Sequence, residues 1–142
     1  MVAQVVLLAA ISAAWLRWGG DWGAAALVAG GVLVLGGAVL IIGGFVALRR
    51  HLSPYPEPLP HATLIVGGVY RMVRHPIYGG IVLGGFGLSL ADGNPVGLTL
   101  TLALTVLLYG KSGFEERRLI EHFPEYAAYR ERVRCRLLPG IC

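Results

Sequence analysis

The longest uncharged stretch, residues 22–48, restricts the fold of this chain more than any other feature. A helix of that length can cross the hydrocarbon core of a bilayer with some tilt. Three shorter uncharged stretches accompany it, at 1–16, 77–91 and 95–110. Only 14% of the 142 residues are charged, against about 25% in a typical soluble domain, so little polar surface remains to face water. The sequence therefore predicts an all-α integral membrane protein with four transmembrane helices.

The last two predicted helices, 77–91 and 95–110, are separated only by Asp92-Gly93-Asn94, which is a strong turn signal. They are predicted to form a tight helical hairpin. The whole chain, 1–142, then reads as one domain. It comprises two N-terminal transmembrane helices (1–48), a cytosolic connector (49–76), the hairpin (77–110) and a cytosolic C-terminal segment (111–142).

The basic residues are distributed unevenly between the two predicted sides of the membrane. If the short turns at 17–21 and 92–94 lie on one side, that side carries Arg17 alone, and the other eleven basic residues lie opposite. Cytosolic loops are enriched in Lys and Arg, so both termini and the connector are predicted to be cytosolic. In a chain this apolar, the excess of basic residues indicates orientation in the membrane, and no nucleic-acid partner is expected. Eleven arginines against one lysine favour a GC-rich, prokaryotic source and hence the inner (plasma) membrane.

Glycines recur every seven residues in the longest uncharged stretch, at Gly30, Gly37 and Gly44. Small residues at such a spacing allow helices to approach closely in lipid. We expect this face to pack against another helix of the chain or against a second copy in a homo-oligomer. A groove that admits a lipid chain or a cofactor is the alternative interpretation.

Beyond Gly110 the chain becomes basic and amphipathic. The Ser112–Glu115 segment resembles a capping box that opens a new helix, although a continuous fourth helix fits equally well. Pro124 can occupy the first turn of a further helix. One side of that helix would carry Tyr126, Tyr129, Val133 and Leu137. It is predicted to lie as a basic amphipathic helix on the anionic cytosolic leaflet. The two cysteines, Cys135 and Cys142, are expected to be free thiols, and no metal site is predicted.

The connector contains residues that point to chemistry. Four prolines within residues 53–60 predict an extended stretch. Further along, Arg74 and His75 precede Pro76, which can begin the third membrane helix, and Tyr78 follows. A helix N-terminus beside Arg and His is suited to bind an anion. The same residues could instead lie at the lipid headgroups, with Tyr78 in an interfacial aromatic belt.

A pair of acids, Glu115 and Glu116, follows the fourth predicted helix. Because the hairpin brings its two helices together, these acids are expected to face the Arg-His-Pro segment across a short gap. Two adjacent carboxylates at a membrane boundary cost desolvation free energy unless they are paired. They could pair with Arg117 or Arg118, or they could bind a cationic ligand. A site with both an anion-binding helix end and carboxylates would suit a zwitterion such as an amino acid.

Taken in order, these residues resemble the isoprenylcysteine carboxyl methyltransferase family and, more broadly, the related phospholipid N-methyltransferases. The likeness covers about residues 53–139. Its central motifs are Arg74-His75-Pro76-x-Tyr78, a glycine-rich apolar helix, a short turn, another helix and Glu115-Glu116. The flanking motifs Gly68-Val-Tyr70 and Phe123-x-x-Tyr126-x-x-Tyr129, together with Pro139, fit the family as well.

The resemblance implies a methyltransferase that uses S-adenosylmethionine, releases S-adenosylhomocysteine and has its active site at the cytosolic membrane face. The cofactor-binding residues that it implies are Tyr70, His75, Tyr78, Gly79, Glu115 and Glu116. In that arrangement a glutamate would accept from the cofactor's α-ammonium group and His75 would serve its carboxylate. Residues 64–70 would form part of the adenosine pocket. The catalytic candidates are Arg74, towards the methyl acceptor, and Lys111, the basic residue shortly before the acidic pair.

The methyl acceptor implied by the resemblance is hydrophobic or amphiphilic: a lipid, an isoprenoid thioether acid or a small hydrophobic thiol. It could enter sideways between the glycine-lined second and third helices. Phospholipid N-methylation and small-thiol S-methylation are the alternatives within the same fold. A non-enzymatic helical-bundle subunit that keeps a remnant of the site is the alternative of another class. A small transporter is disfavoured, because no charged residue lies inside a predicted span.

Overall fold

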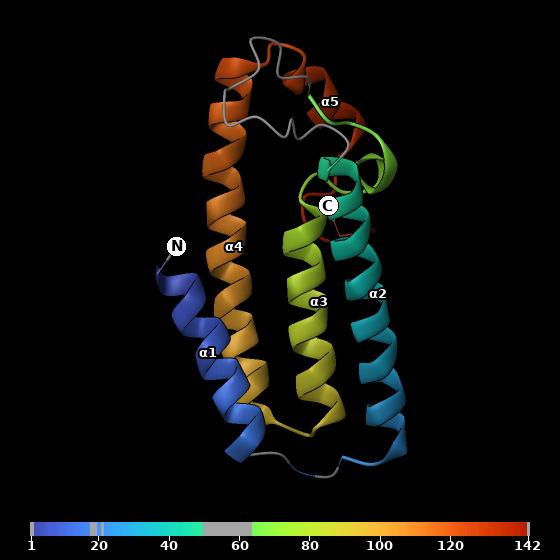
Figure 1. The fold of residues 1–142 in the computed structure, drawn as a ribbon, viewed down its shortest axis with the longest axis vertical. Helices are drawn as coiled ribbons and strands as arrows, with labels where there is room; N and C mark the ends of the chain where they lie inside the picture. Colours follow the sequence, from blue (N-terminus) through green and yellow to red (C-terminus); the bar gives the residue numbers. More distant parts are fainter. Residues whose placement is uncertain (1, 18–19, 21, 50–63, 142) are drawn as a thin grey trace.

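The computed structural model describes residues 2–17, 20, 22–49 and 64–141 (Figure 1). The helices there are α1 (Val2–Arg17), α2 (Ala24–Arg49), α3 (Pro76–Ala91), α4 (Pro95–His122) and α5 (Tyr126–Arg132), with a 3₁₀ turn, η1 (Gly68–Arg71), before α3. Within these ranges the only β-type pairing is an isolated bridge between Leu138 and Ile141. The predicted all-α class is therefore confirmed. The proline-rich stretch 53–60, predicted to be extended, lies outside the described residues.

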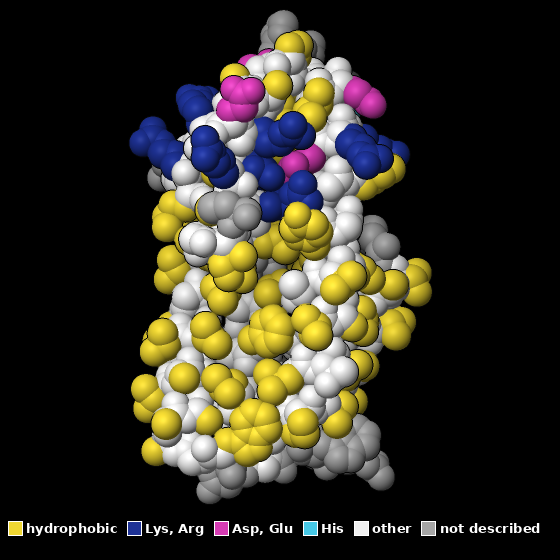
Figure 2. Space-filling model, turned by 180° about the vertical axis from the view of Figure 1, so that it is seen from behind, with side chains coloured by type: hydrophobic (Ala, Val, Ile, Leu, Met, Phe, Trp, Pro, Cys, Tyr) yellow, Lys and Arg dark blue, Asp and Glu magenta, His cyan; other side chains and the backbone are white. Residues whose placement is uncertain are grey.

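Two helices, α2 and α4, are long and apolar enough to cross a membrane, whereas α1 and α3 are shorter apolar helices. Only 17% of the most apolar stretch of α2 is buried inside the molecule. Its outer face exposes large hydrophobic side chains from Leu27 to Val46, a surface that soluble monomers rarely present. In Figure 2 the charged side chains gather at one end of the molecule and the rest of the visible surface is largely apolar. These features suit membrane association, and the crossing by all four helices stays a prediction.

The four long helices pack in pairs, α1 against α4 and α2 against α3, and the α3–α4 hairpin joins the pairs (Figure 1). The hairpin turn is the predicted one. Asn94 caps α4, since its buried Oδ1 accepts the N–H of Gly97 at 2.8 Å. The N–H of Gly20 donates to the carbonyl of Asp92 at 2.7 Å. The α1–α2 turn and the α3–α4 turn therefore lie at the same end of the molecule, as the orientation argument requires.

Glycines bring α2 and α3 into backbone contact. A Cβ added to Gly37 would lie 2.6 Å from the carbonyl oxygen of Gly80, and Gly30 and Gly87 face each other in the same way one heptad along. The predicted close packing is confirmed, and the partner helix belongs to the same chain. Where the two backbones touch, they leave no room for the predicted sideways path of an acceptor, and entry elsewhere along these helices stays a prediction. The glycine face is thus covered by α3, and formation of a homo-oligomer through α2 stays a prediction.

This contact predicts a position-specific effect of glycine replacement. Gly37→Leu should lower the free energy of unfolding by about 1–3 kcal/mol, because the added side chain must push α3 away. Gly31→Leu, in the same helix, should be nearly neutral, since a Cβ there meets nothing within 4 Å. Thermal unfolding in detergent, followed by circular dichroism, measures both variants. Equal melting temperatures for the two would contradict the packing described.

The C-terminal part decides one alternative and departs from the prediction in two ways. First, α4 continues without a break to His122, which is the continuous fourth helix left open above, and Ser112 is buried inside it. Second, α5 ends at Arg132, well short of the predicted amphipathic helix, and begins two residues after Pro124. Third, the predicted lipid-facing side chains are buried within the protein: Tyr126, Tyr129, Val133 and Leu137. They form part of the core at the charged end of the molecule and do not face a leaflet.

The expectation of free thiols is also wrong for Cys135, which is disulfide-bonded. The sequence contains one other cysteine, Cys142, which lies outside the described residues.

Candidate active site

The Arg-His-Pro segment lies where η1 leads into α3. Pro76 takes the first helical position, where its fixed φ suits the helix and its missing N–H is not needed. The preceding backbone is held by the C-terminal segment instead. The N–H of Arg74 donates to the carbonyl of Cys135 at 3.1 Å, and that of His75 donates to the carbonyl of Arg136 at 2.8 Å. Residues far apart in the sequence are thus joined just before α3.

Gly79 explains how the C-terminal segment can come so close to α3. It is buried, and a Cβ added to it would overlap the carbonyl oxygen of Leu137. Gly79 was predicted to bind the cofactor. In the structure it does not line the cavity described below, and it provides the flat surface that the C-terminal segment crosses.

A buried ion pair fixes the same segment from the other side. Arg74, which is 8% exposed, donates from Nε to Glu116 Oε1 at 2.8 Å. Its Nη1 donates to the carbonyls of Val133 at 2.6 Å and Arg134 at 2.8 Å. Glu116 is 2% exposed, and the same Oε1 lies 3.5 Å from Arg136 Nε. Arg74 therefore positions the chain after α5, and its predicted role towards the acceptor stays a prediction.

The second acid, Glu115, belongs to a different cluster. Its Oε1 accepts a hydrogen bond from the hydroxyl of Tyr78 at 2.7 Å and lies 3.8 Å from Lys111 Nζ. His75 stacks parallel to the Tyr78 ring at 5.6 Å between centroids, with Nδ1 3.8 Å from Glu115 Oε2. The Glu115 side chain is 37% exposed. The predicted meeting of the acidic pair with the Arg-His-Pro segment is confirmed.

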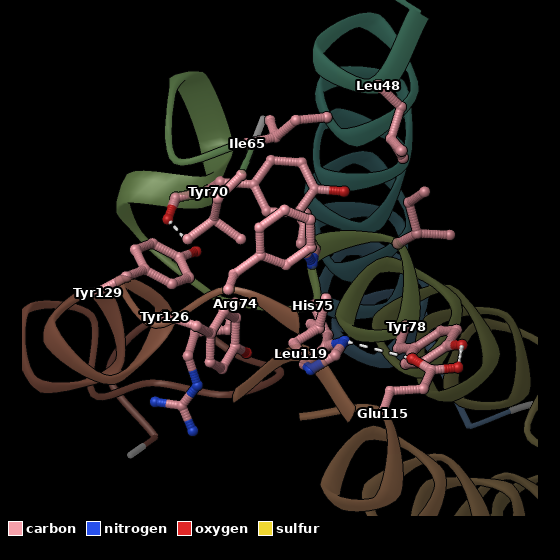
Figure 3. Close-up of a pocket in the computed structure, with 14 residues that line it drawn as sticks. Leu48, Ile65, Tyr70, Arg74, His75, Tyr78, Glu115, Leu119, Tyr126 and Tyr129 are labelled. Atoms are coloured by element: carbon pink, nitrogen blue, oxygen red, sulfur yellow. Dashed lines mark hydrogen bonds and ion pairs between the residues drawn. The ribbon is translucent and has the colours of Figure 1, made fainter. Parts of the chain in front are cut away.

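A cavity of about 390 Å³ opens beside this cluster, within the size range of small-molecule sites. It is lined by Leu48, Leu64, Ile65, Tyr70, Arg74, His75, Pro76, Ile77, Tyr78, Glu115, Leu119, Phe123, Tyr126 and Tyr129. In Figure 3, Tyr78 and Glu115 lie at one end and Tyr70 and Tyr129 towards the other. The cavity thus combines a polar, acidic end with an aromatic end.

The aromatic end is formed by phenols that are held by their own contacts. The hydroxyl of Tyr129 donates to the carbonyl of Tyr70 at 2.7 Å, and Tyr126 packs edge-on against Tyr129. Burial raises the pKa of Tyr129 to about 12 and also raises the pKa of Tyr126 and of Tyr70. These phenols therefore stay neutral at physiological pH and offer apolar ring faces.

Most of the predicted site residues share this cavity, but not all of them. Tyr70, Arg74, His75, Tyr78 and Glu115 line it. Lys111 lies behind Tyr78, with Nζ 5.0 Å from the ring centroid, and also contacts Gln4 of α1 at 3.3 Å. The prediction of site residues did not include Leu48, Leu119, Phe123, Tyr126 or Tyr129. The flanking aromatic motif contains three of them, whereas no local signal marks Leu48 or Leu119.

Two buried polar atoms beside the cavity lack a hydrogen bond within the described part of the chain: His75 Nε2 and Glu116 Oε2. The Nε2 atom lies 3.3 Å from Glu116 Oε1, at ion-pair distance but without hydrogen-bond geometry. A ring nitrogen and an exposed carboxylate at one end, with ring faces at the other, suit a ligand that has a zwitterionic end and a flat end.

The chain is similar to known proteins over the region that contains the candidate site. The family model described as phospholipid methyltransferase matches residues 25–126, which include the Arg-His-Pro segment and both acids. The chain is also 30% identical over 133 residues to the cobalt-zinc-cadmium resistance protein CzcN of Cupriavidus metallidurans. That alignment covers 93% of this chain but only 58% of the relative, so the chain spans little more than half of the relative's length.

Proposed function

Because this chain belongs to the phospholipid methyltransferase family, we propose that it is a membrane methyltransferase that uses S-adenosylmethionine. One observation carries the proposal. A single cavity joins the Glu115–Tyr78–His75 cluster to an aromatic surface formed by Tyr70 and Tyr129. S-adenosylmethionine has the matching ends, an amino-acid group and a flat purine. The donor set therefore fits this cofactor.

The roles of the residues follow from where they lie. Glu115 is the carboxylate open to the cavity, and it would accept from the ammonium group. His75, whose Nε2 lacks a hydrogen bond among the described residues, would serve the carboxylate. Leu64, Ile65 and Tyr70 would contact the adenosine. When bound, the cofactor would supply an electrophilic methyl group.

The chain itself supplies alignment and exclusion of water. Apolar side chains line the cavity beside the polar cluster: Leu48 from α2, Leu119 from α4 and Phe123 directly after α4. Transfer of a methyl group depends on holding donor and acceptor in line more than on covalent help from the protein. A ligand that covers the Glu115 side chain, which is 37% exposed, would exclude water and so strengthen the interaction of this carboxylate with a cationic group.

Isothermal titration calorimetry tests the cofactor assignment. The wild-type protein in detergent should bind S-adenosylmethionine saturably, with a Kd within about 1 μM–1 mM, the usual range of substrate affinities. S-adenosylhomocysteine should compete. Absence of saturable binding by folded wild-type protein would refute the proposal, and it would favour a non-enzymatic bundle subunit.

The acceptor is proposed to be hydrophobic or amphiphilic, since Leu48 of α2 lines the cavity and the outer face of the same helix exposes large hydrophobic side chains. Transfer of a labelled methyl group should be measured with three acceptor classes: phospholipid amines, prenylated carboxylates and small hydrophobic thiols. Because the chain belongs to the phospholipid methyltransferase family, phospholipid amines, the acceptors of N-methylation, should be tested first in this screen. We further propose that the four long helices span a prokaryotic inner membrane with the cavity on the cytosolic side.

A further inference from the structure

A second cavity, of about 490 Å³, lies on the outer face of α4 and is separate from the candidate active site. Consecutive acids divide the two, because Glu115 lines the first cavity and Glu116 the second. The second cavity is lined by Tyr109, Gly110, Gly113, Phe114, Glu116, Arg117, Arg130 and Arg136. On the face shown in Figure 2, basic side chains surround an acidic one at the charged end of the molecule. Three arginines against one acid make this cavity strongly basic.

The single acid does not balance that charge. Glu116 is already bound by the buried Arg74 at 2.8 Å. Arg136 lies 3.5 Å from the same oxygen, yet its Nε is buried and makes no hydrogen bond to a described residue. Arg117 and Arg130 are exposed and form no ion pair with any described residue. The cavity therefore holds guanidinium groups whose donors are free for an anion.

The floor of the cavity is open and partly aromatic. A Cβ on Gly110 would meet nothing within 4 Å, and one on Gly113 would lie 3.5 Å from Arg136 Nη1. The Arg136 guanidinium lies 4.5 Å from the centroid of the Tyr109 ring. Tyr109 and Phe114 are each 56% exposed. Before Lys111, α4 carries no charge, so the cavity lies where the apolar surface meets the charged one.

We propose that this cavity binds the phosphate of an anionic phospholipid. The three arginines would receive the phosphate, and the exposed rings of Tyr109 and Phe114 would contact the glycerol and upper acyl part. A free phosphate shares the arginine chemistry but would leave the aromatic floor uncovered. The proposal does not depend on the reaction at the first cavity.

The test compares two doubly substituted proteins with equal charge. Arg117→Gln with Arg130→Gln removes two cavity arginines, and Arg71→Gln with Arg132→Gln removes two exposed arginines elsewhere. Binding of phosphatidylglycerol to the full-length protein in neutral detergent is measured by native mass spectrometry. The cavity variant should bind roughly tenfold to a hundredfold more weakly than wild type, because it loses two charge-assisted contacts that water partly screens at these exposed arginines. The control should stay within about twofold.

A third variant, Gly110→Leu, fills the floor without changing charge and should also weaken binding roughly tenfold by excluding the lipid. Equal losses in the two double variants would overturn the proposal, because they would indicate attraction by surface charge alone. Unchanged binding in the cavity variant would overturn it too. If inorganic phosphate displaced phosphatidylglycerol at equal concentrations, the lipid assignment would be refuted in favour of a free anion.

Discussion

Replacing Arg74 with methionine is expected to lower the free energy of unfolding by about 3–5 kcal/mol. The change leaves Glu116, which is 2% exposed, without its 2.8 Å partner. It also removes the donor that binds the carbonyls of Val133 and Arg134. Removing one partner of a buried ion pair is costly, because the remaining charge stays desolvated. Thermal and denaturant unfolding in detergent measure the loss.

Arg71→Met is the matched control, since Arg71 is an exposed residue in the neighbouring 3₁₀ turn. It should change stability by no more than about 0.5 kcal/mol. Limited proteolysis adds a local measurement: cleavage after α5 should be faster in Arg74→Met than in wild type. If Arg74→Met melted with the control and resisted protease equally, the ion pair would not hold the C-terminal segment.

The parts of the fold that the sequence predicted well depend on local signals. Pro76 gives the start of α3 to within one residue of the predicted position. Asn94 before Pro95 gives the start of α4, because a capping side chain and a proline at the first turn act within a few residues. The seven-residue glycine spacing predicted the face of α2 that packs closely, since that spacing repeats on one side of a helix.

The parts that could not be predicted depend on contacts between distant residues. The spacing of Tyr126, Tyr129 and Val133 fits a longer amphipathic helix, but α5 ends at Arg132. Beyond it, the carbonyls of Val133 to Arg136 accept hydrogen bonds from Arg74 and His75, about 60 residues earlier in the chain. Tertiary contacts therefore overrode the local pattern. No feature of the sequence near α5 indicates these tertiary contacts.

The different positions of Glu115 and Glu116 could not be predicted from the sequence for the same reason. Adjacent residues on a helix point in directions about 100° apart, so one of Glu115 and Glu116 can face a cavity while the other points away from it. Which one faces it depends on how α4 is rotated against α3, and that is fixed by packing far along the helices. In the structure Glu115 lines the first cavity and Glu116 lies in the buried ion pair.

This division leads to the prediction with the largest effect on ligand binding. Glu115→Gln should weaken binding of S-adenosylmethionine by roughly tenfold to a hundredfold. A hydrogen bond to a charged group contributes about 1.5–3 kcal/mol, and each factor of ten in affinity corresponds to about 1.4 kcal/mol. Stability should change little, because the side chain is 37% exposed and glutamine can still accept from the Tyr78 hydroxyl. Calorimetry and thermal unfolding of the same preparation measure the two quantities.

Two further variants make the result specific to this carboxylate. Glu121→Gln, an exposed position later in α4 that does not line the cavity, should leave both affinity and stability unchanged. Glu116→Gln should behave in the opposite way from Glu115→Gln, with a large loss of stability, since it leaves Arg74 charged and buried. If a folded Glu115→Gln protein bound S-adenosylmethionine with wild-type affinity, the Glu115 carboxylate would not contact the cofactor. The assignment of Glu115 to the cofactor site would then be refuted, even though the protein binds S-adenosylmethionine.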